Sequence, residues 1–139
     1  MIKWKSQYNT KIVKIDNQHK ELIDILNKID KLSLGKINNS DLFEIGVELI
    51  NYSKYHFSTE EKIMKKYDYY GYEYHKEQHL QFIKEIKNII DRSNGIGMML
   101  LSALNNFLKE WIIDHLLGVD QELSEFLISI GADEIEEEE

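Results

Sequence analysis

The sequence contains no cysteine and no proline among its 139 residues, and only seven glycines. Without cysteine, the chain cannot form a disulfide scaffold, a thiolate zinc site or an iron–sulfur cluster. Because proline is absent and glycine is rare, little in the chain interrupts a helix. Apolar residues recur every three or four positions through most of the chain, which is the spacing of a buried helical face. We therefore predict an all-α protein.

The chain also lacks long apolar runs and basic stripes. No apolar run reaches the ~18 residues that a membrane span requires, and residues 1–5 lack the apolar core of a signal peptide. No basic stripe indicates nucleic-acid binding. Residues 133–139 hold six of the eight net negative charges, and such a run is typical of a solvated, disordered tail. We expect a cytoplasmic protein with no membrane or nucleic-acid partner.

Turn residues divide the periodic pattern into four long helices and a short fifth. We expect Asp16 to cap the first helix and Gly35 to end it. The other helices are expected from the polar segment 38–41 to about 67, and at about 72–91, 96–117 and 120–130. Long helices with short connections predict an up-down-up-down antiparallel four-helix bundle. It would have an N-terminal arm and a short C-terminal helix, forming one domain over residues 1–131, followed by an acidic tail over 132–139.

His56 and Glu60 lie four residues apart, so on a helix both side chains point to one face. A single pair of this kind is more often a surface ion pair than a metal site. Here, however, the pair lies on the apolar stripe of its own helix, which includes Leu42, Ile45, Leu49, Tyr52, Ile63 and Tyr67. A buried carboxylate beside a buried imidazole is costly unless it is paired or bound to a metal. The position therefore favours metal binding.

All five histidines fall on the apolar stripes of the predicted helices, and each long helix contributes at least one: His19, His56, His75, His79 and His115. One histidine on an apolar face is more often a satisfied core residue than a ligand. Five unpartnered imidazoles in one core would leave many hydrogen bonds unmade. His75 and His79 have the spacing of a helical metal-binding pair. Gly118 permits a turn that brings the carboxylate of Asp120 back toward His115.

Five imidazoles and two carboxylates are too many ligands for one metal ion. A tetrahedral zinc takes about four ligands, whereas two octahedral ions offer about twelve positions. Five nitrogens, two bridging carboxylates and one bridging oxide or hydroxide would leave about one position open for a small exogenous ligand. Imidazole and carboxylate ligands suit iron. The ligand set therefore predicts two iron ions.

Residues 4 to about 127 resemble the hemerythrins, specifically the bacterial single-domain group. The resemblance rests on an N-terminal arm with Trp4 and Tyr8 and on four motifs that contain the candidate ligands. These motifs are Ile15-Asp16-Asn17-Gln18-His19, His56-Phe57-Ser58-Thr59-Glu60-Glu61, His75-Lys76-Glu77-Gln78-His79 with Phe82, and Trp111-Ile112-Ile113-Asp114-His115 with Asp120.

The resemblance implies a di-iron site that binds dioxygen reversibly. Three histidines would hold one iron, two would hold the other, and two carboxylates would bridge them together with an oxo or hydroxo group. In that order the ligands are His75, His79 and His115; His19 and His56; and Glu60 and Asp120. The iron with two histidines would keep the open position, where dioxygen would bind.

Apolar neighbours of the ligands are expected to wall this open position. Trp111 and Ile112 lie one helical turn before His115 and Leu116 directly after it, and Phe57 is placed to do the same from the second helix. An apolar wall would keep water and protons away from the bound ligand. Ordinary core packing would also account for these four residues, and packing and walling are not exclusive.

The predicted function is dioxygen binding for storage, delivery or sensing, and not catalysis. The alternative is a di-iron oxidase or peroxidase, or an iron-handling protein, because carboxylate-rich bundle sites are the usual frame for oxidative di-iron chemistry. This ligand set is imidazole-rich and nearly saturated, which favours binding over turnover, although a weak oxidase or peroxidase activity is compatible with it. A signalling bundle such as a phosphotransfer module needs one exposed histidine rather than five on core stripes. We expect a monomer, and a sensor would need a separate protein partner.

Overall fold

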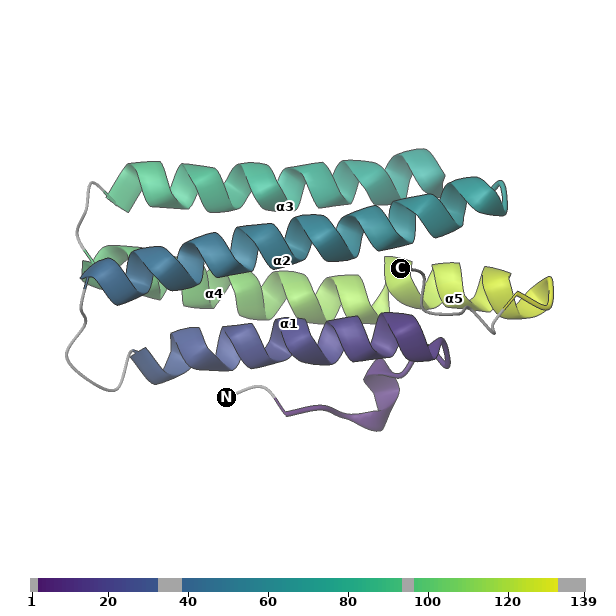
Figure 1. Cartoon of the computed structure of the whole chain (residues 1–139), viewed down its shortest axis with the longest axis horizontal. Helices are drawn as coiled ribbons and strands as arrows, with labels where there is room; N and C mark the ends of the chain where they lie inside the picture. The colour runs from purple at the N-terminus through teal and green to yellow at the C-terminus, as the bar shows by residue number, and fades with distance from the viewer. Residues whose placement is uncertain (1–2, 33–38, 94–96, 133–139) are drawn as a thin grey trace.

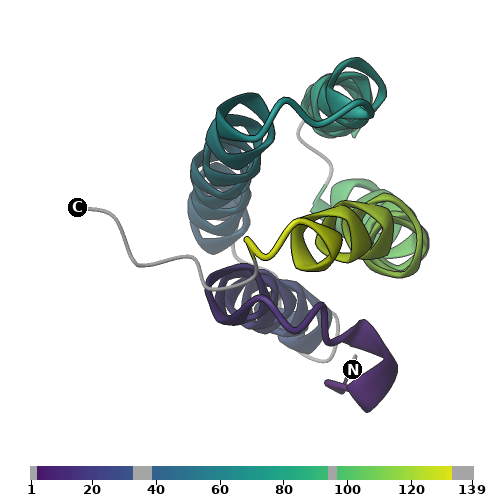
Figure 2. The same ribbon diagram turned by 90° about the vertical axis from the view of Figure 1, so that its right-hand side faces the viewer.

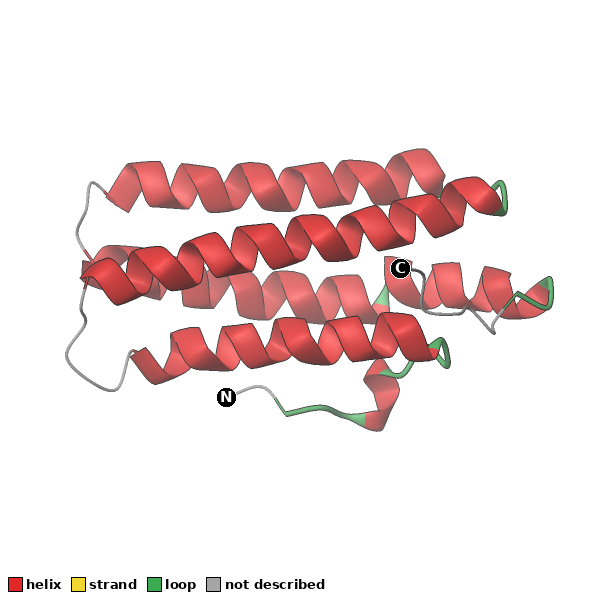
Figure 3. Ribbon diagram, viewed as in Figure 1, coloured by secondary structure: helices red, strands yellow, loops and turns green. Residues whose placement is uncertain are grey.

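The computed structural model describes residues 3–32, 39–93 and 97–132, and all statements below concern these residues. They form a single-turn 3-10 helix, η1 (Ser6–Tyr8), and five α-helices, with no strand in the described ranges (Figure 3). The α-helices are α1 (Val13–Leu32), α2 (Asn39–Lys66), α3 (Tyr72–Ser93), α4 (Gly97–Leu117) and α5 (Val119–Ser129). The prediction of an all-helical protein is confirmed.

The four long helices lie side by side along the long axis, and α5 extends beyond the end of α4 (Figure 1). The chain runs in one direction along α1 and α3 and in the opposite direction along α2 and α4. Viewed along the bundle, the four helices stand around a common centre, with α1 and α3 at opposite corners (Figure 2). Each long helix therefore packs against two neighbours and turns one face toward the shared interior.

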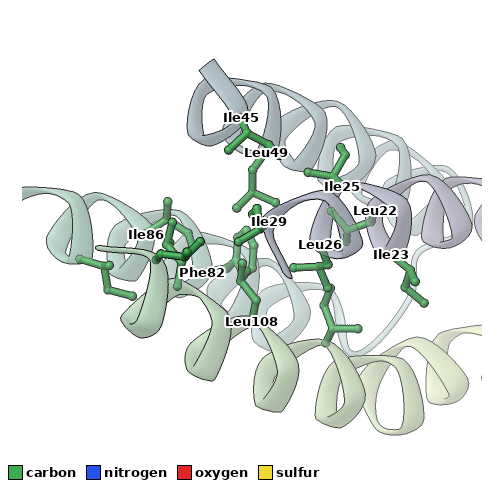
Figure 4. Packing of buried hydrophobic residues seen from close by; sticks show 14 of the residues in the cluster. Leu22, Ile23, Ile25, Leu26, Ile29, Ile45, Leu49, Phe82, Ile86 and Leu108 are labelled. Atoms are coloured by element: carbon green, nitrogen blue, oxygen red, sulfur yellow. The ribbon is translucent and has the colours of Figure 1, made fainter. Parts of the chain in front are cut away.

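Two clusters of buried apolar side chains fill this interior. The larger cluster extends from the half of the bundle where α2 and α4 begin as far as Phe57 and Leu116, and it includes Leu26, Ile29, Leu49, Phe82 and Leu108 (Figure 4). The smaller cluster lies at the other end and joins the arm, α1, α2 and α5 through Ile12, Ile15, Ile63, Met64, Tyr69, Leu123 and Leu127. Full burial of one such side chain stabilises the fold by roughly 1.5–3 kcal/mol. These clusters can therefore offset the cost of burying a polar layer beside them.

The predicted cap of the first helix is wrong. Helix α1 begins at Val13, three residues before Asp16, so Asp16 lies inside the first turn. Its Oδ1 instead accepts hydrogen bonds from the backbone N–H and the hydroxyl of Thr10, each at 2.8 Å. Asp16 therefore ties the arm to the start of α1. Gly35, expected to end this helix, and the acidic tail over 133–139 lie outside the described residues.

The N-terminal arm packs along the bundle and reaches α5. Tyr8 is fully buried, and the indole N–H of Trp4 donates to Asn9 Oδ1 at 3.0 Å. The side-chain amide of Gln121 donates to the backbone oxygens of Gln7 and Asn9, at 3.3 and 3.1 Å. Because Gln121 follows Asp120 in the chain, these bonds hold the start of α5 in place. No helix of the described residues combines the length and apolar character needed to cross a membrane.

Candidate metal centre

All seven predicted ligands meet in one buried layer that both apolar clusters adjoin. Along α2, for example, Phe57 of the larger cluster directly follows His56, and Ile63 of the smaller cluster lies three residues after Glu60. None of the seven side chains is more than 4% exposed. They are His19 from α1, His56 and Glu60 from α2, His75 and His79 from α3, His115 from α4 and Asp120 from α5. The fold therefore brings together residues from all five α-helices.

The carboxylate of Glu60 lies among three imidazoles. Its Oε1 is 3.3 Å from Nε2 of His56, 3.2 Å from Nε2 of His79 and 3.6 Å from Nε2 of His75. These histidines come from two helices, and the sequence analysis assigns them to different irons. The position of Glu60 is thus that of a group shared between two sites.

The carboxylate of Asp120 faces the remaining imidazoles with both oxygens. Its Oδ1 is 3.0 Å from Nε2 of His75 and 3.0 Å from Nε2 of His115, and its Oδ2 is 3.0 Å from Nε2 of His19. One oxygen therefore points to the side with three histidines and the other to the side with two.

The donor atoms of this layer fit a pair of metal ions. The Nε2 atoms of all five histidines and all four carboxylate oxygens have no hydrogen-bond partner among the described residues. Several of them approach within 3.0 Å, as given above, but without the alignment of a hydrogen bond. Leaving such atoms buried and unpaired costs about 1–3 kcal/mol each, a cost that bound cations would remove. The atoms form two groups that share Glu60, each with ligand atoms within 4.8 Å of one another: Glu60, His75, His79 and His115; and His19, His56, Glu60 and Asp120.

Three of the five imidazoles are held from behind by polar side chains that the sequence analysis missed. In each case a side-chain oxygen faces the Nδ1 atom, so Nδ1 carries the proton and the Nε2 lone pair is free to face the centre. The pairs are Gln18 Oε1 with His56 at 2.7 Å, Glu61 Oε2 with His79 at 2.9 Å, and Gln78 Oε1 with His115 at 3.2 Å.

These partners follow one rule along the chain. Gln18, Glu61 and Gln78 each lie next to a candidate ligand in the sequence, yet each binds the histidine of the following helix. Gln18 is itself oriented, because its amide NH₂ donates to the hydroxyl of Thr59 at 3.3 Å. A glutamine or glutamate directly beside a candidate ligand, as at His19, Glu60 and His79, is the sequence signal that would have identified them.

Aromatic side chains hold two of the imidazoles in plane. The ring of Phe57 stacks on His79, with centroids 4.0 Å apart and an angle of 6° between the planes. The indole of Trp111 stacks on His115 at 4.2 Å and 14°. Together with the Nδ1 partners, this stacking leaves these two rings little freedom to rotate.

Burial and charge shift the pKa values of the layer in opposite directions. Burial lowers the pKa values of His56 and His115. Burial acts on His75 in the same way, but the negative charges of the nearby Glu60 and Asp120 carboxylates outweigh it and raise its pKa to about 10. Burial also disfavours the charged form of Asp120, but the neighbouring histidines hold its pKa well below the usual range. The carboxylates therefore stay ionised, as metal ligands must be.

The turn that places Asp120 depends on Gly118. Helix α4 ends at Leu117 and α5 begins at Val119, with Gly118 between them. A Cβ atom on Gly118 would lie 2.8 Å from the backbone oxygen of Asp114, a distance that real side chains do not tolerate. Only glycine fits here without displacement, and the turn brings Asp120 back to His115, as the sequence analysis expects.

A small cavity adjoins the group with two histidines. Its volume is about 10 Å³, roughly the space that one water-sized molecule needs. It is lined by His19, Leu22, His56, Phe57, Trp111, Ile112, His115, Leu116 and Asp120. The four residues predicted to wall a ligand pocket all lie on it, and Leu22 of α1 is an addition that the sequence analysis missed. Three residues of the two-histidine group line the cavity, namely His19, His56 and Asp120, whereas the three-histidine group contributes only His115.

Comparison with known proteins identifies relatives over most of the chain. Residues 10–127 match the family model described as hemerythrin HHE cation binding domain. The chain is 33% identical over 131 residues to a bacteriohemerythrin of Clostridium acetobutylicum, covering 88% of this chain and 98% of that one. It is 30% identical over 117 residues to a bacteriohemerythrin of Pseudomonas aeruginosa, covering 84% and 75%. A crystal structure of wild-type hemerythrin has the same fold, with a TM-score of 0.80 at 24% identity over 90% of this chain and 96% of that one.

Proposed function

The chain belongs to the hemerythrin family, and on that basis we propose that it binds dioxygen reversibly at a di-iron centre held by the seven buried ligands. The observation that carries this proposal is the cavity of about 10 Å³ beside His19, His56 and Asp120. It adjoins the group with only two histidines, where a coordination position would stay open. Its volume suits a diatomic molecule, whereas an organic substrate would not fit.

The two groups of donor atoms support a specific assignment of ligands. Three histidines of α3 and α4 would hold one iron, and the histidines of α1 and α2 the other. Glu60 belongs to both groups, and the two oxygens of Asp120 face opposite sides, so these two carboxylates are placed to bridge, with an oxo or hydroxo group completing the bridge. When bound, the irons would supply the electrons that dioxygen takes up and returns.

The residues of the chain itself orient the ligands and exclude water. Gln18, Glu61 and Gln78 hold three imidazoles with Nε2 toward the centre. Apolar side chains supply the rest of the cavity wall: Leu22, Phe57, Trp111, Ile112 and Leu116. A dry wall lengthens the life of a bound ligand because water and protons promote its loss in reduced form. This arrangement favours binding over turnover, so we propose dioxygen binding, and not oxidase or peroxidase catalysis, as the main activity.

The proposal also covers the topology of the helix bundle and the state of the protein in the cell. We propose an up-down-up-down antiparallel bundle, which the alternating direction of α1 to α4 supports (Figure 1). The bundle domain over residues 1–131, the acidic tail and a cytoplasmic monomer remain expectations from the sequence. Storage, delivery and sensing of dioxygen all use this site chemistry, and sensing would require a separate protein partner.

Metal analysis and oxygen cycling test the proposal together. Protein produced with ample iron should contain close to two irons per chain, because the donor set is too large for one. Its visible spectrum should change on exposure to dioxygen and return when oxygen is removed, and azide should alter the spectrum of the oxidised form. One iron per chain, or zinc as the native metal, would contradict the di-iron assignment. An oxygen-induced change that does not reverse would favour an oxidase.

A further inference from the structure

A second, larger hollow lies on the outside of the bundle between α2 and α3. These two helices lie side by side in both views (Figures 1 and 2). The groove has a volume of about 530 Å³, within the range of roughly 300–1,000 Å³ that small-molecule sites occupy. It is distinct from the cavity beside the two-histidine group, although Phe57 contributes to both. The dioxygen proposal does not use this groove.

The groove contains an apolar surface. Phe57 and Ile83 line it together with Leu80, which is 55% exposed. An exposed leucine is common on protein surfaces, but here it continues an apolar strip that already lies in a hollow. A ligand with an apolar body would remove this strip from water, gaining roughly 25 cal/mol for each Å² covered.

Lysines line both sides of the groove. Lys54 comes from α2, and Lys84 and Lys87 come from α3, where their spacing of three places them on one face. None of the three forms an ion pair with any described residue, whereas lysines elsewhere do, such as Lys28 with Glu48. Three ammonium groups therefore stand around one hollow without a carboxylate partner of their own.

Of the described residues that line the groove, Glu61 alone is acidic, and it is already engaged. Its Oε2 lies 2.9 Å from Nδ1 of His79. The charge that faces an incoming ligand is therefore positive. Glu61 and His79 both line the groove, so a ligand there would lie close to a candidate metal ligand.

We propose that the groove between α2 and α3 binds a small organic anion with an apolar body. The apolar part packs on Phe57, Leu80 and Ile83, and the anionic group faces the lysines. This site is separate from dioxygen binding and does not depend on the identity of the metals.

Two matched dyes test the apolar contact and the charge contact of the proposed site separately. The probe is 1-anilinonaphthalene-8-sulfonate, and its neutral analogue N-phenyl-1-naphthylamine has the same rings without the sulfonate. Titrated into the iron-loaded protein at low salt, the sulfonate should bind once per chain and at least several-fold more tightly than the neutral dye. Inorganic phosphate at the same concentration should not displace it, because phosphate lacks the apolar part.

Variants then locate the site. The double variant Lys84→Gln/Lys87→Gln should weaken sulfonate binding by about tenfold, since exposed charge contacts contribute modestly, and should leave the neutral dye unchanged. Leu80→Glu places a negative charge on the apolar strip and should weaken the sulfonate further. The control is Lys62→Gln, which removes an exposed lysine of α2 outside the groove and should have no effect. Melting temperatures and iron content, measured on every variant, establish that each is folded and loaded.

Several results would overturn the proposal. These are sulfonate binding that the groove variants do not change, equal weakening by Lys62→Gln, and equal affinity for the two dyes. Displacement by poly-glutamate but not by excess unlabelled aromatic sulfonate would assign the face to an acidic protein instead. Iron content and oxygen cycling are measured separately, so failure of this site and failure of the dioxygen proposal can be told apart.

Discussion

Shortening Ile112 should speed the oxidation of the oxygenated protein without loss of iron. Ile112 is 1% exposed and forms part of the cavity wall beside His19, His56 and Asp120. At about 10 Å³ the cavity holds at most one small molecule. In the Ile112→Ala variant the removed methyl and methylene groups enlarge it, so that a water molecule can enter beside His19, His56 and Asp120. Water beside the bound dioxygen supplies protons and promotes its loss in reduced form.

The cost in stability should be appreciable but not fatal. Replacement of a buried isoleucine by alanine typically lowers the free energy of unfolding by about 2–5 kcal/mol, and replacement by valine by about 0.5–1.5 kcal/mol. Because water can enter the enlarged cavity, we expect the loss of unfolding free energy for Ile112→Ala to lie near the lower end of the range for alanine. The Ile112→Val variant removes one methylene and should give an intermediate oxidation rate. Leu116→Ala should act like Ile112→Ala, because Leu116 is also buried on the wall.

The assay is the decay rate of the oxygenated form at fixed temperature and pH, with iron content measured on the same samples. Leu104→Ala is the matched control, since Leu104 is 1% exposed in the larger apolar cluster and does not line the cavity. It should lower stability to a similar extent and leave the decay rate unchanged. His79→Ala should behave differently from both and lose iron.

Two results would refute this reasoning. If Ile112→Ala and Leu116→Ala both keep their iron and decay at the parent rate, dioxygen does not bind in this cavity. If Leu104→Ala accelerates decay as much as they do, the rate reports general loosening of the bundle and not the wall.

Three further predictions concern the turn, the metals and the tail. Gly118→Ala forces a Cβ to within 2.8 Å of the Asp114 backbone oxygen, and overpacking of this kind costs about 1–3 kcal/mol. The variant should therefore melt at a lower temperature, and it should hold less iron because Asp120 moves. A melting temperature and iron content like those of the parent would show that the turn adapts. Iron-free protein should melt well below the loaded form, because metal binding to the native state adds stability, and equal melting temperatures would place the metals outside the core. Deletion of 133–139 should change neither iron content nor melting temperature, and a clear change in either would show that these residues pack on the bundle.

The helices could be predicted because their apolar residues repeat at one period and because glycine and polar segments separate them. The arm could not, because its bonds depend on tertiary contact. Asp16 has a side chain suited to a helix N-terminus, but Thr10 folds back to bind it and the helix starts earlier. No periodicity shows that Gln121 reaches backbone oxygens more than a hundred positions away.

The seven candidate ligands could be selected from the sequence because charged and imidazole groups on apolar stripes are rare and conspicuous. The cavity wall was harder to predict. Spacing placed Ile112 and Leu116 on either side of His115 without showing which one would point inward, and in the structure both do. Leu22 was missed because its position on the wall depends on how α1 lies against α4, and spacing along a single helix carries no information on that.

The hydrogen bonds behind the histidines couple the packing of the helices to the geometry of the centre. Gln18 on α1 binds His56 on α2, Glu61 on α2 binds His79 on α3, and Gln78 on α3 binds His115 on α4. Each bond forms only when two neighbouring helices have the correct rotation and height relative to each other. A helix that slips along its axis would therefore lose both a metal ligand and the partner of the next ligand.

The three bonds are not chemically equivalent. Glu61 carries a charge where the other two partners are neutral amides, so His79 is the imidazole made most electron-donating by its partner. The charged Glu61 binds a histidine of the three-histidine group, whereas the neutral Gln18 binds a histidine of the two-histidine group, which adjoins the cavity. In the proposed assignment, the iron with three histidines would thus receive the strongest imidazole donor. The difference between the two sites is therefore built from the neighbours of the ligands as well as from their number.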